Sequence, residues 1–161
     1  MCSHKSRMPL AGLILLALGL LLPTGGGAAE LSTARQGVIS ANEAFYSAFR
    51  NRDMAAMDAV WSRNDAVAVI HPGWPGIVGR KQVMASWQMI LEGGSPPKIR
   101  SVEPKVQVYG DTAFVVCYEQ VDGGLLVATN IFVLEDDAWR MVHHQASPAP
   151  ATAASGAGKK I

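Results

Sequence analysis

The stretch KIRSVEPKVQVYGDTAFVVCYEQVDGGLLVATNIFVLEDDAWRMVHHQ, residues 98–145, decides the fold class. Apolar and polar residues alternate along it, and this period of two is typical of β-strands with one buried face. Short turn-forming runs divide it into four predicted strands, Ile99 to Tyr109, Thr112 to Val121, Leu125 to Leu134 and Ala138 to Gln145. Connections this short join antiparallel neighbours, so we expect a meander. Pro104 cannot donate to a strand ladder and marks an expected bulge or edge in the first strand.

The residues before the meander have the period of helices. Apolar side chains recur at spacings of three and four over residues 32–51, from the N-cap Asp53 to Trp61, and over residues 83–91. A β-prone run, Ala66 to Ile70, lies between the last two helices and leads into a loop rich in Pro and Gly at residues 71–76. Helices followed by an antiparallel meander predict an α+β fold with one core.

Both ends of the chain differ in composition from this core. Lys5 and Arg7 precede an apolar run from Leu10 to Leu22 and a small-residue segment, which predicts a signal peptide over residues 1–29. The alternative is an uncleaved anchor, although a spanning helix needs about 20 apolar residues. Residues 148–161 are mostly Ala, Pro, Gly and Ser and predict a disordered tail. We therefore expect a domain over residues 30–147 in an exported protein, periplasmic or secreted.

Charge and cysteine content exclude several classes of partner and bond. The chain has 14 basic and 13 acidic residues, and the predicted leader and tail remove four of the basic ones, which leaves 10 against 13. Such a domain has no electrostatic reason to bind nucleic acid or, after cleavage of the leader, a membrane. Only Cys117 remains after cleavage, so no intramolecular disulfide is possible.

The order and spacing of several short motifs carry a resemblance to a known family. These motifs are Asp65-Ala-Val-Ala-Val-Ile-His-Pro-Gly-Trp74, Gly79-Arg80, Val83-x-x-Ser-Trp87, Gly110-Asp-Thr-Ala-Phe114, Ala128-Thr-Asn-Ile-Phe132 and Trp139-Arg-Met-Val-His-His144. Together they resemble the SnoaL-like branch of the nuclear-transport-factor-2-like superfamily. The resemblance implies a cone-shaped α+β barrel, commonly a homodimer, with a pocket between the helices and a curved sheet. It implies no single activity, since members include ketosteroid isomerases, polyketide cyclases, dehydratases and proteins that only bind or assemble.

Comparison with the ketosteroid isomerase pattern yields two candidate catalytic residues. That pattern has an Asp-Pro base where this chain has His71-Pro72, so His71 is a candidate general base. The tyrosine and the protonated aspartate of the ketosteroid isomerase pattern correspond in this chain to Phe45 and Asn130. Phe45 cannot donate a hydrogen bond, and the neighbouring Tyr46 is rotated by about 100° on a helix. Asn130 can donate, which leaves one donor for an oxyanion at this site.

Five residues are predicted to contact a ligand: Phe45, Trp74, Tyr118, His143 and Gln145. The prediction for His143 rests on strand parity, because it alternates in step with Met141 and Gln145 and should face inward while His144 faces outward. Adjacent strand residues face opposite sides, so the two imidazoles cannot bind one ion. We therefore expect no metal, and no phosphate-binding loop suggests a cofactor.

Structural roles compete with these ligand-binding roles at three of the positions. His71 can instead hold the following loop, Trp74 can cover the open end of the barrel, and Asn130 can bond a neighbouring backbone group. Three functions therefore stay open. The domain binds a small, mostly apolar or aromatic molecule, or it is an isomerase, cyclase or dehydratase with His71 as base, or it is a dimerisation or assembly module.

Overall fold

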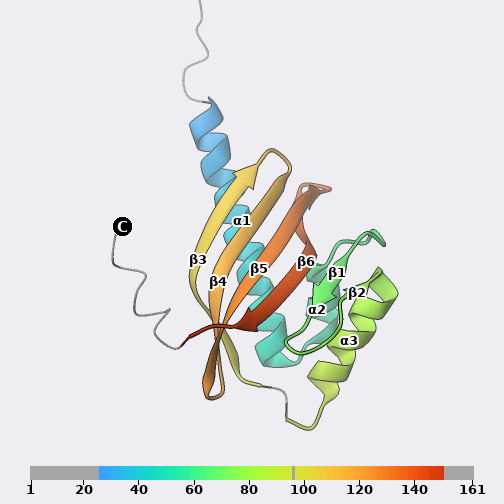
Figure 1. Cartoon of the computed structure of the whole chain (residues 1–161). Coiled ribbons are helices and arrows are strands. Elements are labelled where there is room, and N and C mark those ends of the chain that lie inside the picture. Colours follow the sequence, from blue (N-terminus) through green and yellow to red (C-terminus); the bar gives the residue numbers. More distant parts are fainter. Residues whose placement is uncertain (1–25, 96, 151–161) are drawn as a thin grey trace, which may run out of the picture.

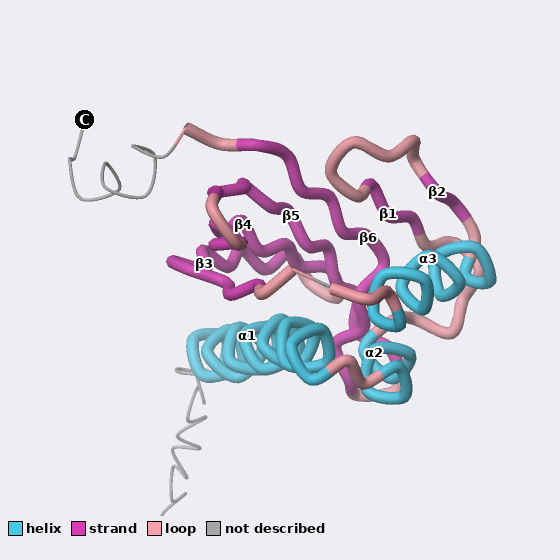
Figure 2. Tube along the Cα trace, turned by 90° about the horizontal axis from the view of Figure 1, so that it is seen from below, coloured by secondary structure: helices cyan, strands magenta, loops and turns pink. Residues whose placement is uncertain are grey.

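The computed structural model describes residues 26–95 and 97–150. Three helices, α1 (Gly26–Asn51), α2 (Met54–Val60) and α3 (Arg80–Glu92), lie on one side of a six-stranded sheet (Figures 1 and 2). The strands are β1 (Ala68–Ile70), β2 (Ile77–Val78), β3 (Ile99–Tyr109), β4 (Thr112–Val121), β5 (Gly124–Glu135) and β6 (Ala138–Pro148). This arrangement confirms the predicted α+β fold.

The sheet order is β2-β1-β6-β5-β4-β3, so the four long strands form the expected meander. Every pairing is antiparallel except that of β1 with β6, which is parallel. The sheet bends around the helices, as Figure 2 shows from below. The register of β3 on β4 shifts between Val102 and Lys105, which confirms the bulge expected at Pro104.

Local sequence signals explain where the short helices begin. Asp53 caps α2, because its carboxylate accepts a hydrogen bond from the backbone N–H of Ala56 at 2.9 Å. The carboxylate of Asp65 accepts the backbone N–H of Arg80 at 2.8 Å and so holds the start of α3. Gly79 before it has φ +93°, a left-handed conformation that favours glycine. Together these contacts fix α3 against the loop that follows β1.

The first helix is longer than the sequence predicted. It begins at Gly26 rather than near Ser32, and Leu31 in its early turns is 47% exposed. The pattern of buried apolar residues could not reveal the first turns of α1, because these turns pack against few other residues. The alanines in them favour helix even where nothing covers them. Residues 1–25 and 151–161 lie outside the described part of the chain, so for these residues the leader and tail remain predictions. Of the residues predicted to be a disordered tail, Pro148 instead ends β6, and the backbone N–H of Ala149 donates to Leu125 O at 2.9 Å. No helix in the described part is long and apolar enough to cross a membrane.

Candidate functional site

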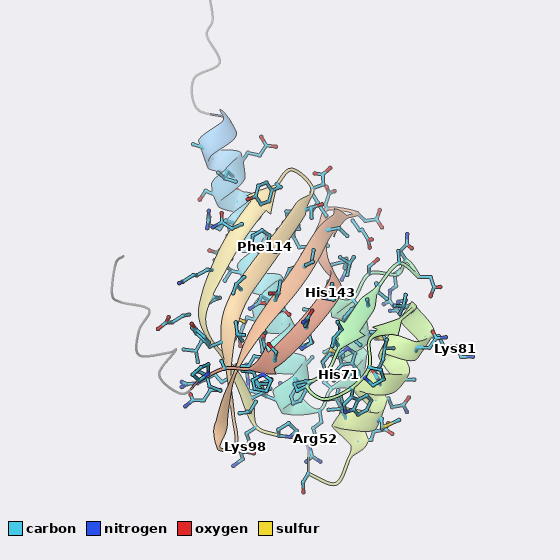
Figure 3. All side chains as sticks on the ribbon, viewed as in Figure 1. Arg52, His71, Lys81, Lys98, Phe114 and His143 are labelled. Atoms are coloured by element: carbon cyan, nitrogen blue, oxygen red, sulfur yellow. The ribbon has the colours of Figure 1, made fainter. Side chains whose placement is uncertain are left out.

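An inner cavity lies between the sheet and the helices near the end of α1. Its volume is about 350 Å³, and its wall is mostly apolar. The lining residues are Phe45, Phe49, His71, Pro72, Trp74, Trp87, Ile90, Pro97, Ile99, Glu119, Val121, Leu126 and His144. Of the predicted site residues, Phe45, His71 and Trp74 are therefore in the wall. Figure 3 shows His71 between the sheet and α3.

Trp87 on α3 is the aromatic centre of this wall. Its ring makes edge-to-face contacts with Phe45 at 5.3 Å, Phe49 at 6.0 Å and His71 at 4.5 Å between centroids. It reaches the cavity because Val83, Trp87 and Leu91 recur on one face of the helix and are all buried. The indole ring is 2% exposed, so the cavity has a rigid apolar side.

His71 follows β1 and points to α3. Its Nε2 lies 2.9 Å from Ser86 Oγ, and that hydroxyl donates its one proton to the carbonyl of Val83 at 2.7 Å. Nε2 must therefore carry the proton in this contact, which leaves Nδ1 as an acceptor. Burial lowers the pKa of His71 to about 4, so the ring is neutral at pH 7. The contact with Ser86 also holds the following loop, so both roles predicted for this residue remain compatible with its position.

Glu119 is the buried carboxyl group of the cavity. It lies on β4 in step with Ala113, Val115 and Cys117, so strand alternation points it inward, where it is 1% exposed. Tyr46 donates its hydroxyl proton to Glu119 Oε1 at 2.8 Å. Burial raises the pKa of Glu119 to about 7, although the hydrogen bond from Tyr46 opposes the rise. Near neutral pH this carboxyl group can therefore hold or release a proton.

His144 on β6 is the second imidazole in the wall. Its Nδ1 lies 2.6 Å from Asn130 Oδ1, and its Nε2 lies 3.9 Å from Glu119 Oε1. Since Asn130 offers an oxygen to this ring, Nδ1 carries the proton and Nε2 is left as an acceptor. Burial, together with the nearby His71 and His143, lowers the pKa of His144 to about 3. The contact with Glu119 is therefore between a neutral imidazole and a carboxyl group, not an ion pair.

Asn130 lies behind the cavity wall rather than in it. Its Nδ2 donates to Asn42 Oδ1 at 2.8 Å and to the hydroxyl of Tyr46 at 3.2 Å, so both of its N–H groups are used. The donor role predicted for Asn130 is therefore wrong in this arrangement. Instead Asn130 positions His144 and fixes its tautomer.

Three predicted ligand contacts lie on the opposite face of the sheet. Tyr118 alternates with the inward-facing Cys117 and Glu119, so it faces outward. In β6, His143 pairs with Ile131 and Met141 pairs with Phe132, which leaves Val142 as an extra residue in a bulge. The bulge reverses the parity of the strand beyond it. The inward orientation predicted for His143 and Gln145 is therefore wrong, and His144 takes the inner position (His143 is labelled in Figure 3).

Sequence reasoning missed Tyr46, Glu119, His144 and Asn42. Two signals were present in the sequence. Glu119 is a charged residue at a position of β4 where strand parity requires burial, and Asn42 occupies the buried stripe between Val38 and Phe45. A buried polar residue needs a partner, so these positions indicate an internal polar network. The bulge at Val142 has no comparable signal.

The described residues contain no group of three His, Cys, Asp or Glu side chains placed to hold a metal ion. Cys117 lies beside the hydroxyl of Tyr46 at 3.2 Å, and burial raises the pKa of its thiol. A thiol in this environment is inert. Among the described residues, the titratable side chains that line the cavity are therefore His71, Glu119 and His144.

A curved sheet covered by three helices around a partly polar cavity defines a class of small α+β barrels. The sequence profile of the SnoaL-like domain matches residues 38–152. This chain belongs to the SnoaL-like domain family of the NTF2-like superfamily, which confirms the resemblance found in the sequence.

Known proteins that resemble this chain differ in their described roles. A candidate dehydratase of the NTF2-like family from Streptomyces avermitilis is 33% identical, with a TM-score of 0.69 over 75% of this chain and 99% of that one. A candidate calcium/calmodulin-dependent protein kinase type II association domain from Thiobacillus denitrificans is 34% identical, with a TM-score of 0.59 over 68% of this chain and 93% of that one. F-box protein SKIP8 from Arabidopsis thaliana is 32% identical over 131 residues, which are 79% of this chain and 55% of that protein. The chain thus spans about half the length of this curated relative.

Proposed function

We propose that this domain binds a small, mostly apolar molecule in the inner cavity. The observation that carries the proposal is an aromatic and aliphatic wall around three buried titratable side chains, His71, Glu119 and His144. A few polar groups converging in an otherwise apolar cavity are typical of small-molecule sites. Two of these groups are oriented by further hydrogen bonds, to Ser86 and Asn130, so the site is organised before a ligand arrives.

The hydrogen bonds around the cavity indicate which polar group the ligand carries. His71 Nδ1 and His144 Nε2 are both acceptors in the tautomers set by their partners. Glu119 accepts when ionised and can donate only when protonated. Of the two lining indoles, the buried Nε1 of Trp87 has no hydrogen-bond partner among the described residues, and Trp74 is 39% exposed. The inner end of the cavity therefore favours a ligand with an O–H or N–H donor, such as a phenol, an alcohol or an arylamine.

A fluorescence titration with N-phenyl-2-naphthylamine tests this proposal. This uncharged probe has an apolar body and one N–H donor, and its emission rises in an apolar site. We expect saturable binding to the purified protein and a loss of affinity of at least about tenfold in Leu126→Trp, which fills the cavity. Thr129→Trp adds the same ring to the outer face of the same strand and should bind as the parent does. Equal binding by both variants would refute cavity binding.

A second candidate function is chemistry in the same cavity. The dehydratase assignment of the Streptomyces relative is one support, and the pairing of Glu119 with the neutral His144 at 3.9 Å is the other. With a pKa near neutrality, Glu119 can act as an acid when protonated or as a base when ionised, and the neutral His144 presents an acceptor nitrogen beside it. His71 remains an alternative base. Loss of turnover in Glu119→Gln and His144→Gln with unchanged probe affinity would support catalysis, and unchanged turnover would exclude a role for this pair.

A third candidate is assembly through the outer face of the sheet. Half-buried apolar side chains form rows on β4 and β5 there, namely Phe114, Val116, Tyr118, Val127, Ile131 and Val133. A contiguous apolar patch of this kind marks an interaction surface. Phe114, labelled in Figure 3, lies on this face.

A homodimer through this outer face would be visible in sedimentation. We expect the purified protein to sediment as a dimer at micromolar concentration and Ile131→Glu to sediment as a monomer, since the charge would be buried without a partner. Ile39→Glu, on the solvent side of α1, is the matched control and should remain dimeric. A parent protein that is monomeric at this concentration would exclude the homodimer.

A further inference from the structure

A second hollow, which we call the basic groove, adjoins the mouth of the inner cavity. It encloses about 690 Å³ between the end of α1, the start of β3 and the turn between β4 and β5. Four residues line both hollows, Phe49, Pro97, Ile99 and Val121. Because these residues line both hollows, the groove and the cavity lie side by side.

The charge of the groove differs sharply from that of the cavity. Four cationic side chains line it, Arg50, Arg52, Lys98 and Arg100, against the single carboxylate of Asp122. Among the described residues, no basic side chain lines the inner cavity apart from the two neutral imidazoles. The combined site therefore has an apolar inner end and a positively charged outer end.

Internal contacts use only part of this positive charge. Arg50 pairs with Glu43 at 2.5 Å, and Arg100 donates to the amide oxygen of Gln120 at 2.6 Å. Within the described residues, Arg52 and Lys98 have no carboxylate within 4.0 Å. Figure 3 shows both near the end of the molecule at which His71 lies. Two cations without an internal partner can therefore act on a ligand at the mouth.

We propose that the ligand is amphipathic, with an apolar body in the inner cavity and an anionic group, a carboxylate, sulfonate or phosphate, in the basic groove. This inference rests on the proposed binding function and adds the charge and direction of the ligand. The anion cannot occupy the inner end, where Glu119 and two acceptor nitrogens would face it. At the mouth, Arg52 and Lys98 can donate charge-assisted hydrogen bonds to it.

A matched pair of probes tests the inference. N-phenyl-2-naphthylamine and 6-anilinonaphthalene-2-sulfonate share one ring system and differ by a sulfonate at the end remote from the N–H group. We expect the parent protein to bind the sulfonate more tightly. The double variant Arg52→Asn and Lys98→Gln should weaken sulfonate binding about tenfold and change binding of the neutral probe by less than about twofold. Asn suits position 52 because the backbone of Arg52 has a left-handed φ of 55°, which Asn adopts more readily than most residues.

Lys81→Gln, on the exposed side of α3 away from the groove, is the control and should leave both affinities unchanged. Added salt should lower the affinity for the sulfonate probe but not for the neutral probe, because salt screens the attraction between the sulfonate and the cationic side chains. Equal affinities of the parent for the two probes, or equal losses in the double variant, would overturn the inference while leaving cavity binding intact. Failure of the parent to bind the neutral probe would overturn the cavity proposal instead. Melting temperatures of the variants establish that each is folded.

Discussion

Replacement of Trp87 by alanine is expected to lower the free energy of unfolding by about 3–5 kcal/mol, the largest change predicted for a single substitution in this domain. The ring contacts Phe45, Phe49, Trp61 and both cavity imidazoles, and it is 2% exposed. Its removal leaves a large void beside a cavity that already exists, so the surrounding side chains have little means of closing it.

Urea denaturation monitored by circular dichroism measures this effect. Met89→Ala on the same helix is the control, since Met89 is 65% exposed and its truncation should cost less than about 0.5 kcal/mol. Similar losses for the two variants would mean that α3 does not place Trp87 in the core, and the described cavity wall would be incorrect.

The second large effect concerns the pH dependence of stability and the buried carboxyl group of Glu119. Its pKa is about 7 in the folded protein against 4.5 for the free group. The raised value means that folding favours the protonated form. The associated stability is therefore complete below pH 4.5 and is lost as pH rises through 7. The loss of folding free energy totals about 3 kcal/mol once Glu119 is ionised in both the folded and the unfolded protein.

Glu119→Gln removes this loss because the amide resembles the protonated carboxyl group in shape and cannot ionise. We expect parent and variant to have similar stability at pH 5 and the variant to be more stable by about 3 kcal/mol at pH 8.5. The groups facing Glu119 are Tyr46, Cys117 and His144, which are present in both proteins, so their contributions largely cancel. Glu92→Gln on the exposed face of α3 is the control. A stability difference that does not change with pH would contradict the protonated, buried state of Glu119.

The architecture was predictable because it depends on periodicity. Alternation over residues 98–145 places four strands correctly, and the capping role of Asp53 and the break at Pro104 follow from residue chemistry. The parallel pairing of β1 with β6 joins segments more than 70 residues apart, and no local signal specifies it. Its consequence matters for the site, because it brings His71, at the end of β1, near His144.

The candidate site was predictable only in part. The places of His71, Phe45 and Trp74 in the cavity wall were predictable, because the orientation of each side chain is set by a single local element. The orientation of β6 depends on where its register slips, and one extra residue at Val142 exchanged the roles of the two adjacent histidines. The helical angle of about 100° between Phe45 and Tyr46 predicts that only one of them faces the site, yet the sheet wraps α1 far enough to bury both.

Nuclear magnetic resonance of ¹⁵N-labelled histidine tests most directly the claim that the inner cavity is a binding site. The three domain histidines, assigned with single His→Gln variants, report from both faces of the sheet: His71 and His144 line the cavity, whereas His143 lies outside it. At pH 7 we predict neutral rings, with the proton on Nε2 of His71 and on Nδ1 of His144. Addition of N-phenyl-2-naphthylamine should shift these two signals and leave that of His143 in place. A shift confined to His143, or a charged ring at His144, would contradict the account.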